Sequence, residues 1–177
     1  SNNVFNRISL FLVISICMVT FFSTYDYVKS EEIRVISGIA KVTDGDTIRI
    51  DQKKIRFYGI DAPENKQKCS KPWLTISFLS FNKEYLCGEI STNRLKDKIN
   101  DKFVTCKWKE KDRYKRFIAE CFREKTNINA WMVRNGYAVA YIKYSKKFIS
   151  HENMAKKQKL GLWAGTFEMP WDYRKKN

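Results

Sequence analysis

Three aspartates in the first part of the chain have the spacing to form one charged site. Asp44 and Asp46 flank a glycine in V-T-D-G-D-T-I, and Asp61 ends the later segment I-R-F-Y-G-I-D. Between them, apolar residues alternate with polar ones, the period of two expected of half-buried strands. If Gln52-Lys53 is a two-residue turn, Asp46 lies opposite Gly59 and Asp44 lies opposite Asp61. Three carboxylates then gather at one end of one sheet face.

Carboxylates held this close repel one another unless a cation lies among them, and an oxygen-rich cluster suits a hard cation such as Ca²⁺ or Mg²⁺. The same register sets Arg49 opposite Arg56, a like-charge pair that is favourable only beside an anion. It also places Arg56 on the other sheet face from Asp46, so that only a strong twist or a bulge would bring both to one site. The alternative interpretation is a solvated hairpin with a D-G-D turn.

The composition is that of one globular and strongly basic domain. With 177 residues, 44% of them hydrophobic and 15% aromatic, the chain can bury a core of its own. The formal net charge is +15, and residues 1–30 contribute only +1 of it (Arg7 and Lys29 against Asp26), which leaves +14 on the remainder. This charge predicts a polyanionic partner, either nucleic acid or an anionic membrane surface.

The N-terminal segment indicates a targeting signal rather than part of the fold. Arg7 precedes an apolar run, Ile8–Phe22, which has the length of a signal-peptide core and falls short of the ~20 residues that span a bilayer. No clear small-residue cleavage site follows, so residues 1–30 are predicted to be either a signal peptide or an N-terminal membrane anchor. In both cases the domain at residues 31–177 is predicted to be exported, as a secreted, periplasmic or membrane-anchored protein.

Four cysteines lie in the part predicted to be exported, an even number that favours disulfides in an oxidising compartment. The segments around Cys106 and Cys121 are predicted strands of one hairpin that turns at Asp112–Lys115, which puts these two cysteines opposite each other. Cys69 and Cys87 then form the second disulfide and close the loop between them. A zinc site is the competing interpretation, but the chain has no C-x-x-C spacing and only one histidine.

The remaining segments predict short strands and helices. A first strand is expected near Ile33–Val42, and residues 65–85, which lack clear periodicity, are expected to form a loop with a short helical piece. Helices are predicted over Gly88–Ile99, behind an asparagine cap at residue 127 or 129, and over Lys146–Leu160. Five short strands with about three packed helices predict an α+β fold, mainly β, built on a small barrel.

Four segments in order resemble the staphylococcal nuclease (thermonuclease) family: V-T-D-G-D-T-I, I-R-F-Y-G-I-D-A-P-E, D-R-Y-K-R-F-I-A and A-K-K-Q-K-L-G-L-W-A-G. The resemblance runs from about Ile33 to Trp171, and the cysteine pattern with the P-W-D-Y-R tail looks like an exported bacterial branch. It implies a five-stranded OB-fold barrel and Ca²⁺-dependent phosphodiesterase activity on DNA and RNA, with P–O5′ cleavage that leaves 3′-phosphate ends.

Carried over position by position, the resemblance implies a Ca²⁺ site built from the acidic segments. Asp46 and Asp61 match the carboxylate ligands, and Ala62 would contribute its backbone carbonyl. Asp44 and Thr47 match positions that surround the metal without ligating it. A divalent cation between carboxylates and phosphate neutralises developing negative charge and orients the attacking water.

The same resemblance implies which groups act on the phosphodiester. Glu64 matches the carboxylate that activates the water by general base catalysis. Arg56 and Arg116 match the two arginines that hold the scissile phosphate, and a guanidinium donates to two phosphate oxygens at once. Tyr114 and Tyr141 would contact the nucleotide.

Lys115 departs from the family pattern, because a glycine is usual there in D-R-Y-G-R, and its side chain is expected to change the aim of Arg116. The main alternative function is a non-catalytic OB module that binds single-stranded nucleic acid, although such a module has no need of Asp46, Asp61 and Glu64 together. A second alternative is a protein of anionic membrane surfaces. The expected partner is DNA or RNA, single-stranded or frayed, bound by a monomer.

Overall fold

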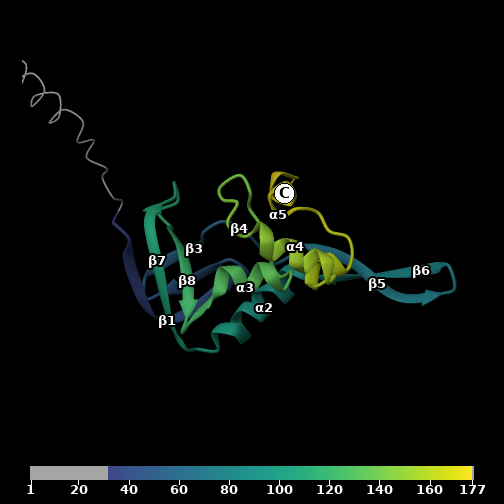
Figure 1. Ribbon diagram of the computed structural model, residues 1–177, viewed down its shortest axis with the longest axis horizontal. Helices are drawn as coiled ribbons and strands as arrows, with labels where there is room; N and C mark the ends of the chain where they lie inside the picture. The colour runs from purple at the N-terminus through teal and green to yellow at the C-terminus, as the bar shows by residue number, and fades with distance from the viewer. Residues whose placement is uncertain (1–31, 177) are drawn as a thin grey trace, which may run out of the picture. The chain divides into compact units, whose positions relative to one another are not determined.

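Five strands close into a barrel around which the rest of the domain is arranged (Figure 1). A computed structural model describes residues 32–176, so the predicted signal or anchor at residues 1–30 lies outside the described residues. The strands of the barrel are β1 (Arg34–Asp44), β2 (Thr47–Ile50), β3 (Lys53–Phe57), β7 (Phe103–Lys111) and β8 (Phe117–Arg123). The order β3-β2-β1-β7-β8 is antiparallel, and a parallel pairing of β3 with β8 closes the barrel. The predicted α+β, mainly β, OB-fold barrel is confirmed.

The barrel interior is filled by the residues whose alternation predicted the strands. Ile48, Ile50, Ile55 and Phe57 each leave at most 1% of their surface exposed, whereas Arg49 between two of them is exposed. Side chains of a strand alternate between its two faces, so one face of each strand supplies the core. Full burial of one such side chain stabilises the fold by roughly 1.5–3 kcal/mol.

The described residues contain four α-helices, one more than the three predicted. They are α2 (Cys87–Ile99), α3 (Ile128–Arg134), α4 (Ile149–Lys157) and α5 (Pro170–Lys176), with a 3₁₀ helix at Gly161–Ala164. The predicted cap of α3 is confirmed, since the Asn127 side chain accepts a hydrogen bond from the Ala130 amide at 3.0 Å. The last predicted helix, Lys146–Leu160, is longer than α4, because the chain turns through residues 144–147 before α4 begins.

The first hairpin differs by two residues from the predicted register. Its turn lies at Asp51–Gln52, with Asp51 in the left-handed region (φ 52°), so that Thr47 pairs with Arg56. The predicted pair of Arg49 with Arg56 is therefore wrong. Because side chains alternate with a period of two, a shift of two residues leaves each side chain on its predicted face.

The predicted pairing of the acidic residues across this hairpin is also wrong. Asp44 pairs with Thr47 across a bulge in β1, and not with Asp61. Asp46 lies in the turn between β1 and β2, so it does not pair with Gly59. Asp61 instead belongs to a short strand, β4 (Ile60–Asp61), which pairs with β10 (Val139–Ala140).

The segment predicted as a loop with a helical piece is a long β-hairpin, made of β5 (Lys68–Ile76) and β6 (Leu79–Leu86). It extends away from the barrel and the helices (Figure 1). Its side chains beyond residue 70 are almost all exposed, so apolar and polar residues do not need to alternate along its strands. The periodicity that marks the barrel strands is therefore missing here, and the prediction was wrong. A further short strand, β9 (Thr126–Asn127), pairs antiparallel with the end of β8.

Both predicted disulfides are present, Cys69–Cys87 and Cys106–Cys121. The second joins directly opposed residues of β7 and β8, as the hairpin prediction required. The core cluster and both disulfides lie within one compact unit that begins at Ile33, so this domain is expected to fold without the residues that precede it. Among the described helices, none combines the length and the apolar character needed to cross a bilayer.

Candidate active site

An open pocket of about 810 Å³ brings the predicted site residues together. Nine of the ten line it: Asp44, Asp46, Thr47, Arg56, Ala62, Glu64, Tyr114, Arg116 and Tyr141. The tenth, Asp61, is wholly buried and accepts a hydrogen bond from Arg56. Segments far apart in the sequence therefore meet in one place, as the resemblance implied.

Arg56 lies between two buried carboxylates. Its Nη1 atom is 2.6 Å from Asp46 Oδ2, an ion pair without hydrogen-bond geometry, and its Nη2 atom donates to Asp61 Oδ1 at 2.7 Å. Strand alternation predicted Arg56 and Asp46 on opposite faces. They meet because Asp46 lies in a turn that follows the β1 bulge, where strand alternation no longer applies.

Three hydrogen bonds hold Asp46 in place, two at its carboxylate and one at its backbone amide. Asp46 Oδ2 accepts a hydrogen bond from the Ala62 amide at 2.7 Å, and Oδ1 accepts one from Thr47 Oγ1 at 3.1 Å. The Asp46 amide in turn donates to Asp44 Oδ1 at 3.1 Å. Residue 45 has to be glycine, because a Cβ there would overlap the side chains of Ala62 and Ser91.

The acidic cluster, formed by Asp44, Asp46 and Asp61, carries more negative charge than Arg56 and Arg174 neutralise. Burial, and after it the charge of Asp46, raises the pKa of Asp44 from 3.8 to about 7. The same two causes raise the pKa of Asp61 to about 6, although a hydrogen bond from Arg174 and the charge of Arg56 oppose the rise. A further positive charge at this place would therefore stabilise the ionised carboxylates.

The oxygen donors of this cluster suit a hard divalent cation, which prefers carboxylate and carbonyl ligands. They are not gathered around a single cation position, since residues 32–176 contain no cluster of three or more acidic, histidine or cysteine side chains with that geometry. Arg56 lies between Asp46 and Asp61 instead. The donor chemistry and the raised pKa values fit a cation, and the arginine now supplies part of the charge that a cation would bring.

The turn between β7 and β8 carries Arg116 into the same pocket. Asp112 holds this turn: its Oδ1 accepts hydrogen bonds from the amides of Tyr114 and Arg116, both at 2.9 Å, and its Oδ2 accepts one from Arg116 Nε at 2.7 Å. Although burial raises the pKa of Asp112, the hydrogen bonds and the charge of Arg116 lower it more, so the pKa lies below its ordinary value. Asp112 fixes the direction of Arg116, and sequence reasoning gave it no role.

Lys115 occupies the left-handed region in this turn (φ 62°), which explains why glycine is usual at this position. A residue with a Cβ is strained there by about 1–2 kcal/mol. We expect Lys115→Gly to stabilise the fold by roughly 1 kcal/mol, after the greater freedom of glycine in the unfolded chain is subtracted. Thermal unfolding should show a midpoint about 2–4 °C higher.

The matched control is Lys125→Gly, at a turn lysine whose φ is not positive. Glycine relieves no strain there and only adds unfolded-state freedom, so we expect a loss of about 0.5 kcal/mol. An equal change in both variants would mean that the Lys115 backbone is not strained.

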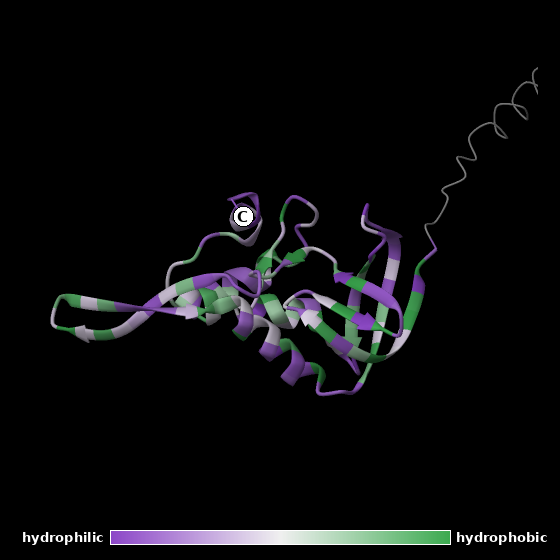
Figure 2. Ribbon diagram, turned by 180° about the vertical axis from the view of Figure 1, so that it is seen from behind, coloured by the Kyte–Doolittle hydropathy of each residue, from purple (hydrophilic) through white to green (hydrophobic). Residues whose placement is uncertain are grey.

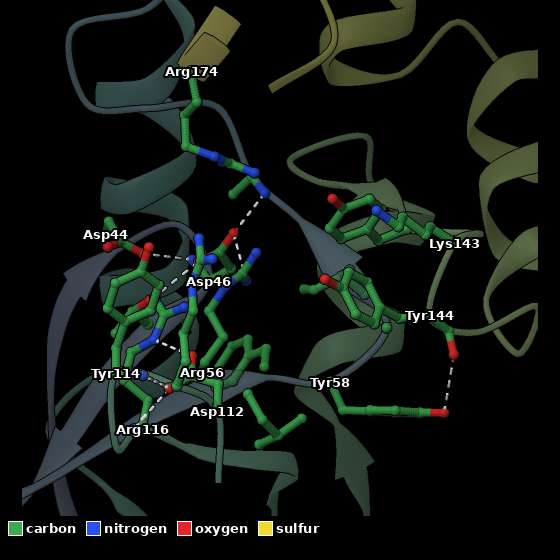
Figure 3. A pocket seen from close by; sticks show the side chains of 18 of the residues that line it. Asp44, Asp46, Arg56, Tyr58, Asp112, Tyr114, Arg116, Lys143, Tyr144 and Arg174 are labelled. Atoms are coloured by element: carbon green, nitrogen blue, oxygen red, sulfur yellow. Dashed lines mark hydrogen bonds and ion pairs between the residues drawn. The ribbon is translucent and has the colours of Figure 1, made fainter. Parts of the chain in front are cut away.

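Arg174 of α5 is the site residue that sequence reasoning missed altogether. Its Nη1 atom donates to Glu64 Oε1 at 2.8 Å and its Nη2 atom donates to Asp61 Oδ2 at 2.7 Å, so that it reaches into the pocket from above in Figure 3. The helix is held in place by Trp171, whose ring stacks on Tyr141 with centroids 5.1 Å apart and planes at 6°. The only sequence signal was the P-W-D-Y-R tail, in which no helix was predicted.

The residues that line the pocket are consistent with the protein family that the sequence matches. Residues 54–165 match the family model described as staphylococcal nuclease homologue. The chain belongs to this family. Membership places it among the nucleases, as an enzyme, and suggests a divalent metal cofactor.

Similar proteins with assigned names support this membership. An Escherichia coli protein named "uncharacterized endonuclease" is 33% identical over 147 residues, covering 77% of this chain and 84% of its own length. A Shigella flexneri protein named "micrococcal nuclease" is 30% identical over 155 residues, with 77% and 79% covered. A Rhizobium meliloti protein named "succinoglycan biosynthesis protein ExoI" is 32% identical over 131 residues, with 72% and 64% covered. The family resemblance inferred from the four sequence segments is thus confirmed.

Proposed function

We propose that this nuclease is a Ca²⁺-dependent phosphodiesterase that hydrolyses DNA and RNA to 3′-phosphate ends. The observation that carries the proposal is the convergence of Glu64, Arg56 and Arg116 on one pocket whose wall holds the buried acidic cluster. A protein that only bound nucleic acid would have no use for buried carboxylates, because they repel phosphate.

Asp46 and Asp61 would hold the cation, together with the backbone carbonyl of Ala62. Bound there, Ca²⁺ would neutralise charge that develops on the phosphoryl oxygens and orient the attacking water. Asp44 and Thr47 would position the ligand Asp46 without binding the cation themselves. The Asp46 amide donates a hydrogen bond to Asp44, and the Thr47 hydroxyl donates one to the Asp46 carboxylate. Calcium is favoured over softer metals because every donor in the set is oxygen.

The two arginines would bind the scissile phosphate from two neighbouring elements, β3 and the turn before β8. A guanidinium has five N–H donors, and Arg56 uses only two nitrogen atoms on Asp46 and Asp61. Arg116 is held by Asp112 through Nε, so both Nη groups are left for a bidentate contact with phosphate oxygens. Two forks converging on one anion would fix its orientation for in-line attack.

Glu64 would accept the proton of the attacking water. It follows β4 and Pro63 directly, and its side chain is 43% exposed, open to the pocket. General base catalysis by a well-placed carboxylate contributes roughly 10²–10⁴-fold. Arg174 would position it: the two hydrogen bonds from one guanidinium fix Glu64 relative to Asp61.

Tyr114 and Tyr141 would contact the nucleotide next to the cleaved bond. Tyr114 is 64% exposed beside Arg116, so its ring is available for stacking on a base. Tyr141 also lines the pocket, where its ring stacks on Trp171. An exposed ring can reach a base only when the base is unpaired, which favours single-stranded or frayed substrate bound by one monomer.

The direct test is digestion of plasmid DNA and of a structureless RNA with Ca²⁺, with Mg²⁺ or with a chelator. Cleavage of both nucleic acids in Ca²⁺ alone is expected, and cleavage that persists in chelator would overturn the proposal. The 3′ ends of the products should resist polymerase extension until phosphatase is added. Products that carry 5′-phosphates instead would show that the P–O3′ bond breaks, with O3′ as the leaving group.

We also propose that the enzyme works outside the cytoplasm. Two disulfides in a domain of this size suit an oxidising compartment, because thiols stay reduced in the cytosol. Comparison of the fraction of protein in culture medium, periplasm and membrane of the producing cells would test this localisation. A protein found reduced in the cytoplasm would contradict it.

Arg174→Gln tests the positioning of Glu64. A hydrogen bond between charged groups contributes about 1.5–3 kcal/mol, so its loss is expected to lower kcat about tenfold with little change in KM. Arg174→Lys should recover part of the loss, because the charge is kept and the fork is not. Lys175→Gln is the matched control, since Lys175 is exposed and pairs with Asp172.

A purely structural role for Arg174 would lower the unfolding temperature in proportion to the loss of activity, and thermal unfolding of the same variants separates the two. A rise in kcat on Arg174→Gln would mean that α5 restrains the site instead of completing it.

A further inference from the structure

The β5–β6 hairpin presents an apolar tip that the nuclease site does not use. Residues 72–82 contain no charged side chain, and no residue of the hairpin lines the pocket. Six of the large hydrophobic side chains that residues 32–176 leave exposed lie within this tip: Trp73, Leu74, Ile76, Phe78, Leu79 and Phe81. Phe78, at the turn, is 90% exposed. The tip is hydrophobic and the stem is hydrophilic in Figure 2.

Strand pairing gathers four of these side chains on one face. Leu74 pairs with Phe81 and Ile76 pairs with Leu79, so all four project from the same side of the ribbon. The other side carries Thr75 and Ser80, whose hydroxyls are 3.4 Å apart. The tip is therefore amphipathic, with one side suited to an apolar environment and the other to water.

Lysines surround the stem below this apolar tip. Lys71 and Lys83 pair directly across the two strands, an arrangement that like charges disfavour unless an anion lies beside them. Lys66 and Lys68 follow towards the barrel, and Glu84 is the single acidic residue between positions 65 and 86. The stem thus has the charge to bind a surface of anionic groups.

The base of the hairpin is firmly attached to the domain. The Cys69–Cys87 disulfide joins its two ends, and Ser70 exchanges two backbone hydrogen bonds with Thr166, at 2.8 and 2.9 Å. Beyond that bridge, β5 and β6 pair with no other strand of residues 32–176. A two-stranded ribbon by itself is only marginally stable in water, so the tip gains from any surface that covers its apolar face.

We propose that this hairpin docks the domain on an anionic lipid bilayer. Its aromatic and aliphatic side chains enter the interfacial layer, and Lys71 and Lys83 bind lipid phosphates above it. The outer edges of the ribbon carry unpaired backbone groups, which cannot enter hydrocarbon without great cost, so immersion stays shallow. Trp73 has the ring type that is enriched at this depth of a membrane.

Two other occupants fit the hairpin less well. A nucleic acid would meet an apolar face that offers no donor to phosphates. A second copy of the chain, joined by a twofold axis through this face, would bring the Lys71–Lys83 pair of each copy to the same interface and add like charges. A bilayer surface matches both parts of the ribbon: its apolar layer can receive the apolar tip, and its anionic headgroups lie at the level of the lysines on the stem.

The proposal is tested by co-sedimentation of residues 32–177 with vesicles of phosphatidylcholine and phosphatidylglycerol, with chelator present so that nuclease chemistry plays no part. Phe78→Ser is expected to lower the partition coefficient at least about tenfold. Phe103→Ser is the matched control, because Phe103 is also an exposed phenylalanine (60%) but lies on β7. Lys71→Gln and Lys83→Gln should each weaken binding roughly fivefold, and vesicles of phosphatidylcholine alone should bind poorly.

Insertion has its own signature in tryptophan fluorescence. Lipids brominated near the headgroup end of the acyl chain should quench the emission of Trp73, and Trp73→Phe should remove that quenching. Cleavage of free DNA should be equal in Phe78→Ser, Phe103→Ser and the unchanged protein.

Three results would overturn the proposal. One is the absence of vesicle binding by the unchanged domain. A second is binding that Phe78→Ser leaves intact and salt abolishes, which would indicate attraction by overall charge. The third is a dimer, seen by analytical ultracentrifugation and dissociated by Phe78→Ser, which would assign the apolar face to contact between two copies.

Discussion

Glu64→Gln is expected to lower the rate of phosphodiester hydrolysis by roughly 10²–10⁴-fold while leaving nucleic-acid binding almost unchanged. The amide keeps the size of the side chain and can still accept a hydrogen bond from Arg174, but it cannot take a proton from water. Binding is expected to be retained because Arg56 and Arg116, the proposed phosphate contacts, are untouched. Removing one negative charge from the pocket should, if anything, favour the phosphate.

The measurement is single-turnover cleavage of a short labelled DNA in Ca²⁺, with fluorescence anisotropy for affinity under the same conditions. Glu110→Gln is the matched control, since Glu110 lines the same pocket but is not one of the carboxylates that Arg56 and Arg174 contact. Its cleavage rate should stay close to that of the unchanged enzyme. Equal cleavage by Glu64→Gln and the unchanged enzyme would mean that another group activates the water.

The barrel could be predicted because its signals are local. Ile48, Ile50, Ile55 and Phe57 alternate with polar residues, and burying one face of a strand needs only that period. The register of the hairpin could not be predicted, because a turn at 51–52 and a turn at 52–53 bury similar side chains. The choice depends on Asp51 tolerating the left-handed region, as a short polar side chain does.

The meeting of Asp46 with Arg56 shows where pattern reasoning stops. The alternation rule separated these residues because it treated the whole segment as strand. The structure takes Asp46 out of the strand and into a turn that follows a bulge, close against Ala62 and Ser91. A contact made by a turn depends on its conformation, which the periodicity of the flanking strands does not contain.

Arg174 and Asp112 were missed for different reasons. Arg174 lies 110 residues after Glu64, and its short helix depends on the packing of Trp171 against Tyr141, a tertiary contact. Asp112 was quoted within D-R-Y-K-R, but a turn aspartate has a structural explanation of its own, because it accepts hydrogen bonds from the amides of its turn. Only its third bond, to Arg116 Nε, connects it to the site.

Arg116→Lys is expected to lower kcat by at least about 10²-fold, by analogy with the loss of one donor to a developing oxyanion. Lysine keeps the positive charge but not the planar fork, so the phosphate would be attracted and no longer held in two places. Arg116 tests this better than Arg56 does. Replacing Arg56 would leave Asp46 buried without its counter-charge and Asp61 with Arg174 alone. Breaking a buried ion pair destabilises a fold by about 3–5 kcal/mol, so a loss of folding would be confused with a loss of catalysis.

Asp112→Asn separates the aim of Arg116 from its charge. Asparagine still accepts hydrogen bonds from the turn amides but loses the ionic contact with Arg116 Nε, so we expect kcat to fall about tenfold. If Asp112 acts only through Arg116, adding Asp112→Asn to Arg116→Lys should cause no further loss, because the group that it directs is already gone. Additive losses in the double variant would show that Asp112 acts on the substrate by another route. An Arg116→Lys enzyme with unchanged kcat would remove Arg116 from the phosphate site and leave Arg56 and Arg174 as its cations.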